Sequence, residues 1–258
     1  MEGLSEKAIQ GGLNTRFIGQ VARFYSSIPS TMDAARALAQ EGAPEGTIVV
    51  AVEQTSGRGR LERPWRSPPG GSILLSALLK PSTAEASRLT MVASLAVSQS
   101  LEETLGLAAA IKWPNDVLVR GKKIAGILVE SHLRDGETAF CIVGIGVNVN
   151  FDPALLGDVI YPATTVSAEL GRSVPLLPLL QAILERFEDL YLRVKGGWPV
   201  HEQWQQRLET IGKQIRVTGI DRVEYGLAEG VTEDGSLILR RSDDTATTIL
   251  AGDVTLRG

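Results

Sequence analysis

Residues 109–149 hold the pattern that most constrains the fold, because short apolar runs alternate there with two-residue turn signals. The strands expected in this region are residues 109–113, 117–119, 124–132 and 139–149. Arg120-Gly121 and Asp135-Gly136 mark tight turns, and a turn of two residues joins antiparallel neighbours. The run therefore predicts strands that lie side by side in one sheet.

Helical periodicity on both sides of this run predicts that helices cover the sheet. Residues 82–105 carry an apolar stripe, and the apolar side chains of residues 176–194 recur at steps of four and three. Ser30 is followed three residues later by Asp33, which is close to a capping box and predicts a helix start. Two further strands are expected at residues 47–52 and 72–79. The main fold is therefore expected to be α+β, a mixed or antiparallel sheet covered by helices.

The sequence pattern changes near Ile211, where short apolar runs and turn residues, typical of strands, replace helical periodicity. The strands expected beyond this point are residues 214–217, 223–228, 236–240 and 247–250. We predict a main domain at residues 1–210 and a small β-barrel domain at residues 211–258. Residues 1–20 lack periodicity and are expected to form a loose leader.

Composition excludes several classes of function. The net charge of -4 and the pI near 5.4 give no overall basic field, so a nucleic-acid partner is not expected. One cysteine, Cys141, excludes an internal disulfide framework, and two histidines make a structural zinc cluster implausible, which fits a cytoplasmic protein. The polar start and the lack of a run of about 18 apolar residues predict a chain that is neither exported nor inserted in a membrane.

A glycine- and arginine-rich segment, residues 53–71, separates two of the expected strands, and so long a loop in a compact fold is usually functional. Its part from Gln54 onward has one carboxylate, Glu62. The four arginines of that part are Arg58, Arg60, Arg63 and Arg66. One guanidinium group can bind two phosphate oxygens at once, and glycine lets the backbone approach a phosphate closely. The segment predicts a polyanion site, although a solvated basic turn remains an open alternative.

A second basic cluster lies at residues 112–116 and continues at Lys122 and Lys123. A lysine that enters a strand beside a hairpin can present its ammonium to the same phosphate and stabilise charge that develops during transfer. A surface hairpin with both lysines in solvent is the other reading.

Several common nucleotide-binding and catalytic motifs are absent from the sequence. The chain has no G-x-x-x-x-G-K-[ST], and Gly144-Ile-Gly146 lacks the third glycine of a dinucleotide fingerprint. No Ser-His-Asp set can be recognised. Cys141, inside an apolar run, is expected to be a buried small hydrophobe and not a nucleophile.

Five motifs in order resemble the biotin protein ligases, over about residues 22–258. They are residues 30–33, residues 53–60, residues 112–116, residues 123–130 and residues 144–149. The resemblance implies a class II synthetase-like catalytic domain that binds biotin and ATP, followed by an SH3-like barrel. One departure is Glu62, which stands where the family's arginine loop usually has a third glycine.

The resemblance implies a biotin-[biotin carboxyl-carrier protein] ligase. Such an enzyme activates biotin with ATP and Mg²⁺ to biotinyl-5′-AMP and transfers it to a lysine of the carrier domain of acetyl-CoA carboxylase or a related carboxylase. The residues expected to stabilise charge in catalysis are Arg58, Arg60 and Lys123. The residues expected to bind biotin or its adenylate are these three together with Ser30, Thr31, Met32, Gln54, Gly57, Gly59, Trp65 and Gly126. Nucleotide-binding candidates are Arg63, Lys112, Asn115, Asp116 and Asn148, and no protein metal site is expected.

The resemblance also implies that residues 55–66 close over the adenylate, while the role of Asp116 stays open. Some family members carry an N-terminal helix-turn-helix domain, but only about 20 residues precede the core here, so a DNA-binding role is not expected. The protein could be a monomer or a homodimer. Two alternatives remain: a lipoate or octanoate enzyme of the same fold, and a biotin-binding protein without turnover.

Overall fold

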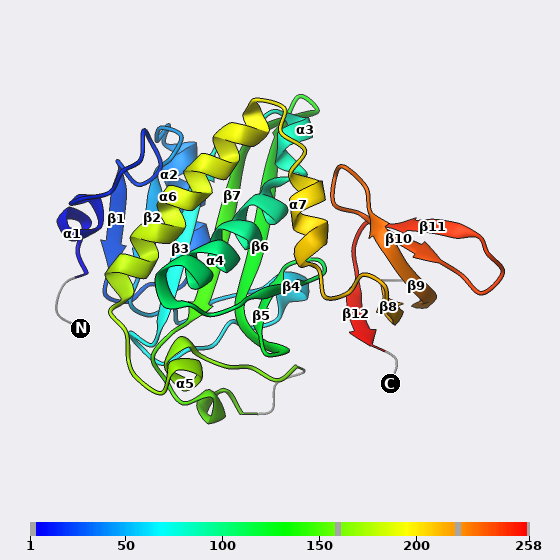
Figure 1. Cartoon of the computed structure of the whole chain (residues 1–258). Coiled ribbons are helices and arrows are strands. Elements are labelled where there is room, and N and C mark those ends of the chain that lie inside the picture. Colours follow the sequence, from blue (N-terminus) through cyan, green and yellow to red (C-terminus); the bar gives the residue numbers. More distant parts are fainter. Residues whose placement is uncertain (1–3, 158–160, 220–222, 257–258) are drawn as a thin grey trace.

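The computed structural model describes residues 4–157, 161–219 and 223–256 and contains a seven-stranded sheet (Figure 1). Its strands are β1 (Ala22–Tyr25), β2 (Ile48–Ala51), β3 (Ser72–Leu79), β4 (Ala110–Lys112), β5 (Asp116–Val119), β6 (Lys122–Arg134) and β7 (Glu137–Asn148). They lie in the order β1-β2-β3-β7-β6-β5-β4, with β1 parallel to β2 and all other pairs antiparallel. Both predicted hairpins of the β5–β7 run are present, and the α+β class is confirmed.

Helices cover the sheet from both sides. The long helices α4 (Leu89–Leu105) and α6 (Leu176–Lys195) pack on each other and on one face, whereas α2 (Thr31–Gln40) contacts β2, β3 and β7 from the other (Figure 1). The remaining helices are α1 (Glu6–Gln10), α3 (Thr83–Ala86), α5 (Val166–Leu170) and α7 (Val200–Arg207), with single 3₁₀ turns at Arg60–Glu62 and Pro153–Leu156. No helix among the described residues is long and apolar enough to cross a membrane.

The single helix expected over residues 82–105 is two helices in the structure. Ser82 and Glu85 form a capping box that starts α3, and the chain then turns at Ser87 and Arg88 before α4 begins. This turn brings Leu89 into the core, where its side chain is fully buried. Burial of the long helix α4 therefore determines where the helical segment is interrupted.

The alternation of side chains along β7 sorts them onto two faces. Cys141, Val143, Ile145 and Val147 belong to the large core beneath α4 and α6. The opposite face receives the intervening residues Ile142, Gly144, Gly146 and Asn148. Because two of these residues are glycines, which have no side chain, this face of the sheet leaves room for other groups beside α2.

The prediction of a loose leader is wrong for residues 4–20, while residues 1–3 lie outside the described residues. Ile9 and Ile18 are fully buried, and α1 packs against α6. Glu188 of α6 accepts hydrogen bonds from the backbone N–H groups of Arg16, Phe17 and Ile18. A buried carboxylate needs donors, and this segment supplies three of them.

Replacing Glu188 by alanine is expected to lower the free energy of unfolding by about 3 kcal/mol, because three backbone donors lose their acceptor and an internal gap opens. Urea unfolding measures the change. The matched control is Glu185→Ala on the same helix, since Glu185 accepts one exposed bond from the Asn14 N–H, and we expect a loss of at most about 1 kcal/mol. Equal losses in the two variants would contradict a special role for Glu188.

A second, smaller sheet follows α7 and lies beside the end of the main sheet (Figure 1). It consists of β8 (Gln214–Thr218), β9 (Val223–Val231), β10 (Leu237–Arg240), β11 (Ala246–Ile249) and β12 (Asp253–Leu256), in the antiparallel order β11-β10-β9-β8-β12. Four of these strands were predicted, and β12 is an additional one that pairs with β8. The buried Trp113 joins the two sheets by donating its Nε1–H to the carbonyl of Gly235 (2.9 Å).

Candidate functional site

A pocket of about 380 Å³ lies on the face of the main sheet that α4 and α6 leave free. Its size suits a small organic ligand. The predicted residues that line it are Ser30, Thr31, Met32, Gln54, Arg58, Gly59, Arg60, Arg63, Trp65, Asn115, Asp116, Lys123, Gly126 and Asn148. Gly57 and Lys112 are not among the lining residues. Gly57 instead packs beside Gln54, where a Cβ would come within 2.9 Å of the Gln54 amide nitrogen.

The floor of the pocket depends on glycine. A Cβ on Gly146 would lie 2.5 Å from the Trp65 ring, and one on Gly126 would lie 3.0 Å from the same ring. A Cβ on Gly144 would lie 2.8 Å from the sulfur of Met32. These strand positions therefore leave a flat, apolar surface for Trp65 and for a ligand.

One end of the pocket is polar and uncharged. Gln54 Oε1 accepts hydrogen bonds from the N–H of Thr31 (2.7 Å) and from its hydroxyl (2.9 Å). The Thr31 hydroxyl also contacts the hydroxyl of Ser76, 2.8 Å away and fully buried in β3. Since the Thr31 hydroxyl donates to Gln54, the Ser76 hydroxyl donates to Thr31. The network fixes the orientation of each group around a buried position.

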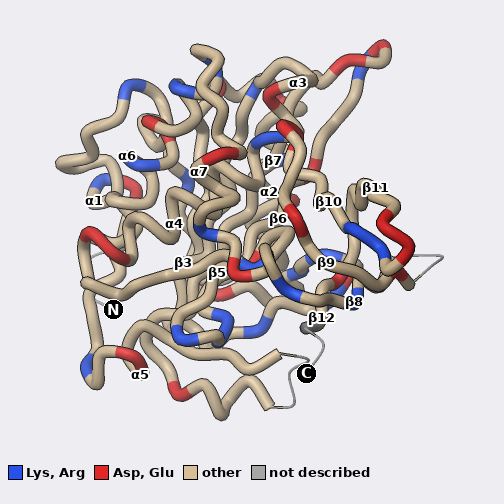
Figure 2. Tube along the Cα trace, turned by 45° about the vertical axis from the view of Figure 1, so that its right-hand side comes forward, with Lys and Arg blue, Asp and Glu red and all other residues tan. Residues whose placement is uncertain are grey.

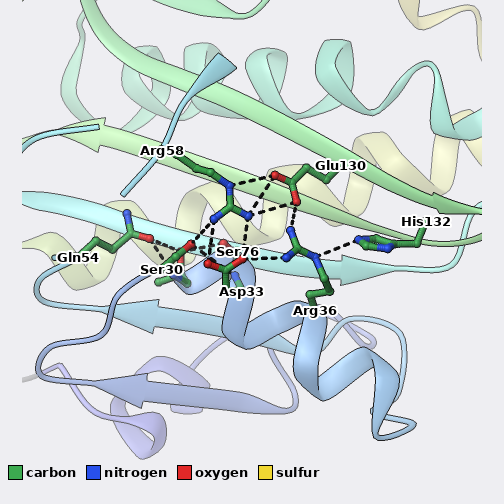
Figure 3. Close-up of polar contacts among 9 residues, drawn as sticks. Ser30, Asp33, Arg36, Gln54, Arg58, Ser76, Glu130 and His132 are labelled. Carbon is green, nitrogen blue, oxygen red and sulfur yellow. Dashed lines mark hydrogen bonds and ion pairs between the residues drawn. The ribbon is translucent and has the colours of Figure 1, made fainter. Parts of the chain in front are cut away.

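Arg58 is held by two carboxylates at the rim of the pocket (Figure 3). Its guanidinium donates two bonds to Asp33 (2.8 and 2.9 Å) and two to Glu130 (3.2 and 3.4 Å). Arg36 contacts the same two carboxylates and donates from Nε to His132 (3.1 Å). The hydrogen bonds between Arg58 and Asp33 raise the pKa of the guanidinium and lower the pKa of the carboxyl. The arginine-rich loop is thus attached to α2 and to β6 at once.

Lys123 carries the second cation of the pocket wall. Its ammonium lies 2.6 Å from a carboxylate oxygen of Asp116 and 5.7 Å from the centroid of the Trp65 ring. Its backbone is fixed as well, because its N–H donates to the carbonyl of Pro162 and its carbonyl accepts from Thr164. The neighbouring Lys122 is exposed to solvent. The hairpin therefore aims only one of the two lysines at the pocket.

The arginine-rich loop reaches the small sheet. Arg60 donates to the side-chain oxygen of Asn115 (3.1 Å) and to the carbonyl of Gly252, and Arg63 forms an ion pair with Asp253. Glu62 is exposed and has a φ of 55°, a conformation that glycine adopts without strain. Within the described ranges Glu62 forms no ion pair, so Asp253 serves as the carboxylate partner of Arg63.

Cys141 is fully buried on the α4 and α6 side of β7, as predicted, and burial raises the pKa of its thiol. A thiol in this position faces away from the pocket and stays protonated, so it does not serve as a nucleophile there. Across the described parts of the chain, no group of three or more histidine, cysteine or acidic residues is arranged to hold a metal ion.

The site also contains residues that the sequence analysis did not assign to it, although three of them lie inside the motifs at residues 123–130 and 144–149. They include Ser76, Glu130, Gly144, Gly146, Tyr161 and Asp253. Two signals were available: a serine inside an otherwise apolar strand, and glycines at alternate positions of β7, which share one face. Tyr161 and Asp253 carry no local signal, because only the folded chain brings them to the pocket.

The comparisons with known proteins agree on one kind of protein. A family profile described as the Biotin/lipoate A/B protein ligase family matches residues 24–150, and one for the biotin protein ligase C terminal domain matches residues 210–257. The chain is 37% identical over 245 residues to the bifunctional ligase/repressor BirA of Bacillus subtilis, which covers 93% of this chain and 75% of that protein. It is 36% identical over 201 residues to the biotin--[acetyl-CoA-carboxylase] ligase of Paracoccus denitrificans, covering 74% and 83%. A solved structure, the Aquifex aeolicus biotin protein ligase in complex with biotin and ATP, matches with a TM-score of 0.76 and 30% identity, over 92% of this chain and 99% of that one.

Proposed function

This chain belongs to the biotin protein ligase family, and from that premise we infer how its pocket works. The protein is a ligase that activates biotin with ATP to biotinyl-5′-AMP and transfers biotin to a lysine of a carboxyl carrier protein. The observation that best supports this activity is the division of the pocket into an uncharged polar end, a glycine floor and a cationic wall. Each part suits one part of the reacting pair.

The polar end suits the ureido ring of biotin. Thr31 and Gln54 line the pocket with hydroxyl and amide groups that can pair with the ring's N–H and C=O groups, and the buried Ser76 hydroxyl supports Thr31 from behind. A lipoyl or octanoyl group lacks such groups and would leave this network facing an apolar ligand, which costs binding free energy. The network therefore favours biotin over the alternative acids.

The cationic wall suits the adenylation step. The biotin carboxylate attacks the α-phosphorus of ATP, a P–O bond forms, and pyrophosphate leaves with the electrons of the bond that breaks. Arg58, Arg60 and Lys123 stabilise the charge on the α-phosphate and on pyrophosphate, by position and electrostatics and without a covalent enzyme intermediate. These cations also argue against a biotin-binding protein without turnover.

Magnesium fits the same wall as a companion of ATP. The Asp116 carboxylate lines the pocket, and its oxygens are hard ligands of the kind that Mg²⁺ prefers. Bound there with the phosphates, the ion would neutralise part of their negative charge. The remaining ligands would come from the nucleotide and from water.

Transfer follows when the acceptor lysine amine attacks the carbonyl of the mixed anhydride. An amide bond forms, AMP leaves and the amine releases a proton. Residues 58–60 and 63–66 line the pocket, and we propose residues 55–66 as the cover that shields the anhydride from water. We further propose that the domain boundary lies near residue 210. We also propose that the protein is cytoplasmic, is a monomer or a homodimer, and has no DNA partner.

The test is ATP–pyrophosphate exchange by the purified protein with biotin, lipoate and octanoate in parallel. We expect exchange with biotin at least about a hundredfold above that with the other acids, because only biotin pairs with the polar end of the pocket. Exchange that is faster with lipoate or octanoate would overturn the substrate assignment. The absence of exchange with any acid would favour a binding protein without turnover.

A further inference from the structure

Tyr161 connects three parts of the site. It lines the pocket, and its ring centroid lies 3.3 Å from the ammonium of Lys112. Its hydroxyl donates to the backbone carbonyl of Val254 in β12 (3.2 Å). One half-buried side chain therefore joins a lysine of the main sheet to the first strand positions of β12, on the small sheet.

Lys112 depends on this ring. It is half-buried, and burial lowers the pKa of its ammonium. Asp116, Glu209 and Asp253 act on it electrostatically, but no carboxylate in the described ranges forms an ion pair with it. The face of an aromatic ring attracts a cation, so the tyrosine supplies the direct contact that an acid would otherwise provide.

The same stretch of β12 also contacts the arginine-rich loop. Asp253 pairs with Arg63, and the preceding carbonyl of Gly252 accepts from Arg60. Lys112, through the tyrosine, and two arginines of the loop are thus attached to neighbouring residues at the start of β12. This strand lies beside β8 in the small sheet (Figure 2). A change at Tyr161 removes one of these attachments and leaves the other in place.

We propose that Tyr161 is a positioning residue for ATP. Its ring, which lines the pocket, holds the Lys112 ammonium beside the pocket, and its hydroxyl fixes the ring to Val254. This inference rests on the proposed function, because Lys112 needs a polyphosphate on which to act. The lysine has a flexible four-carbon stem, and an ammonium held in place before binding loses less freedom when ATP arrives.

The experiment is a double-mutant cycle measured by biotin-dependent ATP–pyrophosphate exchange. Tyr161→Leu removes the ring, and we expect the KM for ATP to rise about tenfold, with kcat and the KM for biotin changed less than about twofold. Tyr161→Phe keeps the ring and loses the hydroxyl, so its rise should be smaller, about threefold. In a Lys112→Met background, Tyr161→Leu should cause no further rise, because the lysine that the ring positions is gone.

Two results would overturn the inference. One is an equal rise in the KM for ATP with Lys112 present and with Lys112 replaced, since this would show that the ring acts independently of the lysine. The other is a rise in the KM for biotin as large as that for ATP, which would indicate general damage to the pocket. If Tyr161→Leu fails to fold, Tyr161→Phe measured in both backgrounds decides the question. Failure of the wild-type protein to exchange would instead overturn the proposed function.

Discussion

Replacing Lys123 by methionine is expected to slow biotin-dependent ATP–pyrophosphate exchange about a hundred- to a thousandfold. The ammonium is the cation that β6 directs into the pocket, and methionine keeps the length of the side chain while removing the charge. The interaction of the Lys123 ammonium with the substrates strengthens as charge moves onto the phosphates. We therefore expect kcat to fall by a larger factor than the affinity for the substrates. Biotin binding, followed by titration calorimetry, should weaken less than about threefold, because the polar end that holds the ureido ring is unchanged.

Lys122→Met is the matched control for this prediction. It makes the same chemical change one residue earlier on the same strand, at an exposed position outside the pocket lining. We expect exchange within about twofold of the wild-type rate. A similar loss in both variants would mean that the net charge of the hairpin determines the rate and that the orientation of Lys123 toward the pocket does not.

The elements predicted well from the sequence are those with a local cause. The strand at residues 72–79 has the predicted bounds, because its apolar run ends at glycines and a proline. The turns at Arg120-Gly121 and Asp135-Gly136 join the predicted strands, and positive φ angles at all four residues explain why those residue types mark them. Period and turn chemistry are properties of neighbouring residues, so a single sequence is enough to read them.

The elements that were missed depend on distant partners. Residues 1–20 show no periodicity, yet their backbone donors meet Glu188 about 170 positions later in the chain. The five-residue α1 and the four-residue β1 are too short for a periodic signal and are held by burial against α6 and β2. Tertiary contact decides such segments, and nothing in the local sequence reports it.

The candidate site divides in the same way. Ser30, Gln54, Arg58 and Lys123 belong to motifs that could be read directly, and the fold brings them to one pocket. Their partners could not be assigned beforehand. The structure shows that Arg58 is paired with Asp33 and Glu130, whereas the sequence suggests a cation free to meet a phosphate.

That pairing makes Arg58 the second position with a large expected effect. Arg58→Met should lower kcat/KM for ATP at least about a hundredfold in the exchange assay, because a cation at the pocket is lost and the carboxylates of Asp33 and Glu130 are left with Arg36 alone. Uncompensated negative charge beside a triphosphate site repels the substrate. Adding Glu130→Gln to Arg58→Met should therefore recover about tenfold of the lost activity, since it removes one of the exposed charges.

Arg36→Met separates this electrostatic effect from a structural one. Arg36 contacts the same two carboxylates as Arg58 but does not line the pocket, so its loss should reduce kcat/KM for ATP by less than about tenfold. Thermal unfolding of all three variants shows whether the cluster still holds α2 against β6. If Arg36→Met were as damaging as Arg58→Met, or if Glu130→Gln gave no recovery, the cluster would only support the fold and Arg58 would have no direct part in handling ATP. Recovery without a gain in thermal stability would show that Glu130, once unpaired, acts on the nucleotide through its charge.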